Sequence, residues 1–169
     1  MEKLVDARIG GTFNFYRDGE GAAARAGRLE RYLHERRDAR ILLVGEAPGY
    51  RGTRVSGIPL TSERQLTGAG PGEATATIVH AVLGELGIAD DVLLWNVVPT
   101  HPGTASSNRH PTRGEIEAGR AFLDALVPGR RVIGLGRIAQ SACGGPYVRH
   151  PSHGGAAAFR SGVAALING

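Results

Sequence analysis

Glu46, Asn96 and His150 each stand at the end of an apolar segment, and their side chains together suit one kind of chemistry. In a parallel sheet the C-terminal ends of the strands meet at one edge, so residues roughly fifty positions apart converge there. A carboxylate, an amide and an imidazole supply a base, a paired donor and acceptor, and a donor for developing negative charge. Each has an ordinary explanation alone, as a loop contact, an ion pair or a turn cap, and only their joint placement predicts a site.

The elements that must position these residues alternate between strand and helix along the chain. Apolar runs predict strands at 40–44, 91–98, 131–135 and 147–149. Helical periodicity predicts helices at 21–37, 73–86, 112–126, 136–142 and 156–166. Thr112 and Glu115 have the spacing of a capping box, and Gly87 is placed to end the second helix. The glycine-rich stretch 49–72 is predicted to form long loops.

This order of elements predicts a single domain over residues 1–169. The fold class is α/β, a three-layer α/β/α sandwich with a four-stranded, mostly parallel central sheet and right-handed crossovers. Cys143 is the only cysteine, which excludes an internal disulfide and any cluster held by several thiolates. We expect it to be a small buried apolar residue.

The segment 1–6 lacks a signal-peptide core, and no apolar run approaches the roughly 20 residues that a membrane helix needs. We therefore expect a cytoplasmic protein.

Charge is distributed unevenly along the chain, whose formal net charge is +4. The last acidic residue is Asp124, and beyond it the charged side chains are all arginines. A compositional bias explains the choice of arginine over lysine as well as function does, but it does not explain the missing acids. The asymmetry predicts a polyanionic partner such as nucleic acid, because arginines neutralise phosphates and release counterions.

Two cofactor signals are weak. The segment Gly134–Ala139 matches the dinucleotide pattern G-x-G-x-x-A but has no acidic residue about 20 positions later for a ribose hydroxyl. A tight turn from strand to helix explains it better. Four histidines lie in predicted loops, without the spacing or the carboxylate and thiolate ligands of a metal site: His101, His110, His150 and His153. We predict neither a metal nor a cofactor.

Several short motifs occur together and in order. They are Gly45-Glu-Ala-Pro-Gly49, Gly57-Ile-Pro-Leu-Thr-Ser-Glu63, Trp95-Asn-Val-Val-Pro99, Asn108-Arg-His-Pro111 and His150-Pro-Ser152. This set resembles the uracil-DNA glycosylase superfamily, particularly its branch with a Gly-Glu-Ala-Pro-Gly first motif, along most of the chain. The resemblance implies a parallel four-stranded sheet between helices. It also implies a DNA repair enzyme that flips deoxyuridine out of DNA, hydrolyses the N-glycosidic bond to release uracil and leaves an abasic site.

The resemblance carries specific roles onto matching residues. His150 would donate to uracil O2, and Asn96 would read the O4 and N3–H edge. Glu46 would orient water and stabilise the cationic sugar, while backbone amides around Glu46 and Ala47 would hold the uracil oxygens. The residues expected to contact DNA are Thr61, Ser62, Arg149, Ser152 and His153.

Departures from the family pattern refine these expectations. Ala47 stands where the best-known branch has a water-activating aspartate, which places more weight on Glu46. Leu60 stands where a phenylalanine usually stacks on uracil, so either Leu60 forms an apolar floor or Tyr50 stacks on the base. The single Cys143 cannot hold the four-cysteine iron–sulfur cluster typical of the branch, which indicates a cluster-free relative.

Further departures concern DNA. His153 and two glycines stand where the family usually has a leucine wedge. We therefore expect that His153 or Arg149 fills the gap that the flipped base leaves in the DNA helix, or that single-stranded DNA is preferred. Asn108 stands where a relative that traps itself on DNA has a histidine, so we expect turnover. We expect a monomer that works in the cytoplasm at the bacterial nucleoid. The alternative is a catalytically degenerate module that binds uracil or damaged DNA without cutting.

Overall fold

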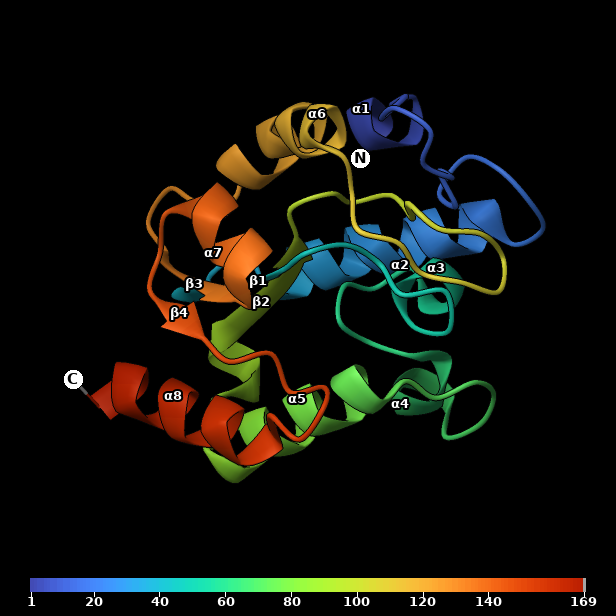
Figure 1. The fold of residues 1–169 in the computed structure, drawn as a ribbon. Helices are drawn as coiled ribbons and strands as arrows, with labels where there is room; N and C mark the ends of the chain where they lie inside the picture. Colours follow the sequence, from blue (N-terminus) through green and yellow to red (C-terminus); the bar gives the residue numbers. More distant parts are fainter. Residues whose placement is uncertain (169) are drawn as a thin grey trace.

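The computed structural model describes residues 1–168, and Figure 1 shows a small central sheet with helices packed on both of its faces. The strands are β1 Ile41–Gly45, β2 Val92–Asn96, β3 Arg131–Leu135 and β4 Tyr147–Val148. They follow the order β2-β1-β3-β4, and every pairing is parallel. The three-layer α/β fold predicted from the sequence is therefore confirmed, with β1 near the centre of the sheet.

The strands form because continuous apolar runs are buried on both faces of the sheet. Every residue of β1 and of β2 is buried. Successive side chains of a strand point to opposite faces, so Leu42 and Val44 belong to one hydrophobic cluster while Ile41 and Leu43 belong to the other. The sheet is thus the shared floor of two cores.

Helices cover both faces. The first cluster contains buried residues of α1 Glu2–Val5, α2 Ala22–Glu35, α6 Arg113–Asp124 and α7 Arg137–Cys143. The second contains residues of α5 Ala74–Glu85 and α8 Ala156–Asn168, which lie together below the sheet in Figure 1. Two short helices, α3 Thr53–Ser56 and α4 Glu63–Thr67, lie in the connection after β1, and a single 3₁₀ turn, Ala89–Asp91, precedes β2.

Helix ends match the local signals in the sequence. The Thr112 side chain accepts from the backbone N–H of Glu115 at 3.3 Å, and the Glu115 carboxylate accepts from the backbone of Thr112. This confirms the capping box. Gly87 directly follows Leu86, the C-cap of α5. It has φ +66°, a conformation that glycine adopts without strain.

The structure differs from the prediction in short elements. Helices α1, α3 and α4 have four or five residues, too few for helical periodicity to register, so 49–72 is not all loop. The second strand ends at Asn96, because Val97 and Val98 turn away while their N–H groups still bond the backbone of Gly45 and Glu46. Cys143 is only partly buried, in the last turn of α7 against the first cluster.

Within residues 1–168, no helix combines the length and the apolar character that crossing a bilayer requires.

Candidate active site

A cavity of about 370 Å³ opens at the C-terminal ends of the strands. Its wall comes from the loop after β1, the start of α5, the loop before α6 and the turn after β4. Six of the residues singled out from the sequence line it: Glu46, Ala47, Leu60, His150, Ser152 and His153. The size is that of a small-molecule site, and its position is the one expected for a ligand of a parallel α/β sheet.

Glu46 directly follows β1, and the strand holds it at the cavity. Its side chain is 27% exposed, and Oε1 lies 2.6 Å from Nδ1 of His110. His110 also lines the cavity. The sequence motif contained this histidine, but we considered it only as a possible metal ligand. Within the described residues, no group of three or more histidine, cysteine or carboxylate side chains is arranged to hold a metal ion.

His150 is half-buried, and its hydrogen bonds determine its tautomer. The backbone N–H of Ser152 points to Nδ1 at 3.2 Å, and the Ser152 hydroxyl lies 2.7 Å from the same atom. Because an N–H can only donate, Nδ1 accepts, and the proton of the neutral ring is on Nε2. Burial lowers the pKa of His150, and His153 and Arg149 lower it further. His150 is therefore a neutral N–H donor at pH 7.

Asn96 closes β2 with its side chain only 1% exposed, and it is not part of the cavity lining. Neither its Nδ2 nor its Oδ1 has a hydrogen-bond partner among residues 1–168. A buried amide without partners is destabilising by about 1–3 kcal/mol, which a ligand offering both a donor and an acceptor would recover. Asn96 therefore has the signature of a binding group.

Leu60 lines the cavity and lies beside this amide. A Cβ atom on Gly45 would lie 2.9 Å from Leu60 Cδ2 and 2.7 Å from Asn96 Oδ1, so both side chains press on the same glycine. Leu60 has φ +50°, which a leucine adopts only when its surroundings impose it. Its N–H donates to Thr53 Oγ1 at 3.1 Å.

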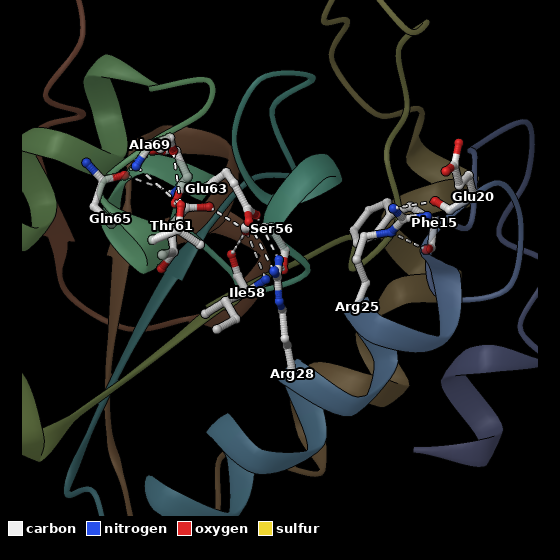
Figure 2. Close-up of polar contacts among 12 residues, drawn as sticks. Phe15, Glu20, Arg25, Arg28, Ser56, Ile58, Thr61, Glu63, Gln65 and Ala69 are labelled. Carbon is white, nitrogen blue, oxygen red and sulfur yellow. Dashed lines mark hydrogen bonds and ion pairs between the residues drawn. The ribbon is translucent and has the colours of Figure 1, made fainter.

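The loop that carries Leu60 is fixed to α2, as Figure 2 shows. The Arg28 guanidinium binds both oxygens of the Glu63 carboxylate, at 2.7 and 3.0 Å, and donates to the backbone oxygen of Ser56. The Ser56 hydroxyl in turn donates to the backbone oxygen of Thr61 at 2.7 Å. These bonds hold residues 56–63 in place.

Three other residues predicted for the site have different surroundings. Thr61 is buried, and its hydroxyl bonds His80 and the backbone of Pro59. Ser62 is buried as the N-cap of α4. In this structure both hydroxyl groups are thus bound within the protein, and their expected contacts with DNA stay a prediction. Tyr50 lies outside the cavity lining, and its backbone N–H donates to Asn108 Oδ1 at 2.9 Å.

The residues after β4 that were predicted to contact DNA are accessible. Arg149 and His153 are exposed, and the Ser152 hydroxyl lies 3.1 Å from Nδ1 of His153. Arg149 is outside the cavity lining, whereas Ser152 and His153 form part of its rim. His153 has φ +52°, a left-handed conformation that is uncommon for residues other than glycine.

The loop before α6 is held by a buried carboxylate. Arg109 donates to both oxygens of Glu115, at 2.6 and 2.7 Å, and the Glu115 side chain is only 3% exposed. Glu115 also accepts from the backbone of Gly11 and Thr112. The hydrogen bonds from Arg109, more than the backbone bonds, lower the pKa of Glu115 to about 2 despite burial. This pair fixes the segment that presents His110.

Comparison with known proteins identifies the family of this chain. A model of the uracil DNA glycosylase superfamily matches residues 33–164, which includes every cavity residue described above. The chain belongs to this superfamily. The glycosylase-type chemistry of DNA repair therefore applies to it, with DNA as its partner.

A solved structure shares the fold of this glycosylase-family chain. The crystal structure of wild-type SMUG2 from Pedobacter heparinus has a TM-score of 0.67 at 16% identity, covering 99% of this chain and 96% of that one. The Gly-Glu-Ala-Pro-Gly branch is consistent with these findings. No match was found among curated proteins.

Proposed function

We propose that the protein is a monofunctional uracil-DNA glycosylase, which flips deoxyuridine out of DNA and hydrolyses the bond between sugar and uracil. The observation that carries this proposal is the arrangement of Glu46 and the neutral His150 around one cavity, with the unpartnered amide of Asn96 beside Leu60. Flipping is required because the target bond is inaccessible inside the base stack.

His150 acts on the departing base. When the bond from C1′ to N1 breaks, its electron pair stays on uracil, which leaves as an anion. A donor that is already in place stabilises this charge in the transition state more than in the ground state. The Nε2–H of His150 suits this role, because Ser152 fixes the ring through Nδ1 and burial keeps the ring neutral. We assign its contact to uracil O2.

Glu46 acts on the sugar and the water. Positive charge develops at C1′, and a carboxylate nearby stabilises it. Oε1 of Glu46 binds His110, while Oε2 has no protein partner within residues 1–168. This second oxygen is available to accept a hydrogen bond from the attacking water. The water oxygen bonds C1′, and its proton passes to the carboxylate or to solvent.

Asn96 reads the base. Its amide oxygen accepts from uracil N3–H and its amide nitrogen donates to O4, the reverse of what cytosine offers along the same edge. In this structure Leu60 lies beside the amide, so we propose that the entering base displaces the leucine side chain. Leu60 then supplies the apolar floor. Ala47 leaves room for the ring at the start of the same loop.

The DNA backbone is assigned to the exposed turn after β4. Arg149, Ser152 and His153 lie outside or on the rim of the cavity, where the strand entering the site would pass. We propose that the protein acts as a monomer. The substrate makes nucleoid DNA in the cytoplasm its proposed place of action.

Purified protein should be incubated with an oligonucleotide that contains one deoxyuridine and then treated with alkali. Strand breaks at that position are expected, with no breaks in matched thymidine and deoxycytidine oligonucleotides. His150→Ala should lower the single-turnover rate by about 10²- to 10³-fold, the usual loss for one transition-state donor. An intact deoxyuridine oligonucleotide at high enzyme excess would refute the proposal.

A second function is favoured by one specific observation. Ala47 and Leu60 both replace groups that assist catalysis in the best-known branches, so a degenerate module that binds uracil or damaged DNA without cleavage is the alternative. Gel-shift titration distinguishes the two. Tight binding to deoxyuridine DNA, with no base released over many hours, supports the binding module.

A further inference from the structure

Glu73 is a second carboxyl of the active-site cavity, and no motif described above contains it. It is the N-cap of α5, but its side chain makes no capping hydrogen bond. Instead, the carboxyl lies against the loop after β1. A Cβ atom on Gly49 would overlap Oε1 of Glu73, and a Cβ atom on Gly52 would overlap Oε2. We call this arrangement, the Glu73 carboxyl against Gly49 and Gly52, the glycine seat.

Charge does not hold the carboxyl in the seat. Within residues 1–168 the Glu73 side chain has neither an ion pair nor a hydrogen bond to protein, and burial raises its pKa. The other carboxylate that lines the cavity belongs to Glu46. Burial disfavours the charged form of a carboxyl, so its charge does not stabilise this position. The Glu73 carboxyl therefore fits the glycine seat by its shape and not by its charge.

The seat lies against a turn that backbone hydrogen bonds also hold: the N–H groups of Gly52 and Arg54 donate to the oxygen of Gly49 at 3.2 and 3.3 Å. The Glu73 carboxyl occupies the space where a side chain at either glycine would lie. Gly49 lines the cavity three residues after Glu46. A change in the turn 49–52 is thus expected to move both the cavity wall and the nearby Glu46 carboxylate.

We propose that Glu73 is a positioning residue, whose carboxyl fills the glycine seat and so holds the loop 46–52 in the geometry that the reaction needs. The proposal rests on the proposed uracil excision for its kinetic test. Displacement of catalytic groups by about 1 Å lowers rates by about 10²-fold, so loss of the seated group is expected mainly in kcat.

Side-chain replacements give the first test. Glu73→Ala should lower kcat for uracil excision by about 10- to 100-fold while KM changes by less than about threefold. Glu73→Gln fills the same seat without charge and should retain most of the wild-type kcat. Glu85→Gln, at the exposed end of the same helix, is the matched control and should change nothing. Equal losses in Glu73→Gln and Glu73→Ala, with both folded, would overturn the proposal.

A double-mutant cycle gives the second test. The three atoms nearest to a Cβ on Gly49 all belong to the Glu73 carboxyl, so Gly49→Ala expels that carboxyl. Gly49→Ala should therefore resemble Glu73→Ala, and the double variant should be no slower than either single variant. Gly84→Ala, with open space around its new Cβ, is the glycine control. Losses that multiply in the double variant contradict the seat.

Thermal unfolding of the same proteins tests the seat without any activity. Gly49→Ala should lower the melting temperature, and adding Glu73→Ala should restore part of the loss, because the overlap is then gone. Additive decreases would overturn the proposal. If the wild-type protein releases no uracil, the proposed function fails while this cycle still decides whether the seat exists.

Discussion

Two histidines line the cavity, and their different surroundings suit them to different roles. His150 is half-buried and held by Ser152, whereas the His110 side chain is 81% exposed and, among residues 1–168, bonds Glu46 alone. His150 therefore suits a fixed donor, and His110 suits a group that orients a carboxylate. Replacing either one should then affect a different step of the reaction.

His110→Ala is expected to lower the excision rate by about tenfold, because the Glu46 carboxylate loses its only hydrogen-bond partner among residues 1–168. Affinity for DNA should stay within about twofold of wild type. Single-turnover rates and gel-shift titrations measure the two quantities. His34→Ala, on the exposed face of α2, is the control. A wild-type rate in His110→Ala would mean that the contact with Glu46 has no role in excision.

The site residues were predictable where strand ends determine them. Glu46 and His150 come to the cavity because each follows a parallel strand, and the sequence shows both runs. Asn96 was predicted in the same way, but no local pattern indicates its burial or the left-handed backbone of the neighbouring Leu60. Thr61 was predicted to contact DNA from its place in the motif 57–63, which does not indicate which way a side chain turns.

Elements were predictable in proportion to their length. The five longer helices have enough residues to show a helical period and the strands were recognised by their apolar runs, whereas α1, α3 and α4 are too short to show a period. Contacts between residues far apart in the chain could also not be predicted from the sequence. The ion pair of Arg109 with Glu115 joins residues six apart, yet its third partner, the backbone of Gly11, lies 104 positions away.

Glu115 anchors α6 and the loop before it, so its loss is expected to destabilise the whole fold. The pKa near 2, against 4.5 without these contacts, corresponds to about 3 kcal/mol. Because the folded pKa is lowered, this stability is present above pH 4.5 and is lost as the pH falls towards 2. Glu115→Gln should therefore lower the unfolding free energy by about 2–3 kcal/mol at neutral pH, and by less in acid.

Urea unfolding at about pH 7 and about pH 3 measures this difference. Glu117→Gln, on the exposed side of the same helix, removes a surface pair with Arg113 and should change stability by less than about 0.5 kcal/mol. A Glu115→Gln loss that is the same at both pH values would argue against the ionised carboxylate as its cause.

Charge is distributed unevenly over the whole molecule. Glu46, Glu73 and Arg109 all line the cavity, while the chain beyond Asp124 carries no acidic residue. A polyanion is therefore attracted most strongly to the C-terminal part of the chain, which includes the turn after β4. This arrangement separates DNA affinity, which depends on salt, from excision, which depends on geometry.

Arg149→Ala should test that separation. Loss of one phosphate contact is expected to reduce the slope of log affinity against log salt by about 0.9. The single-turnover rate at saturating DNA should stay within about threefold of wild type. Arg120→Ala, on α6, is the matched control. An unchanged salt slope in Arg149→Ala would remove this residue from the DNA contact.

The order of the strands has one more consequence. With β1 between β2 and β3, the sheet consists of three strands of five residues and one of two, and the residues that line the cavity lie beyond their C-terminal ends. Insertions and deletions in the loops that follow the strands leave the hydrogen bonds between the strands unchanged. Evolution, or a protein engineer, can therefore retailor which damaged base is accepted by exchanging loops, while the sheet stays the same.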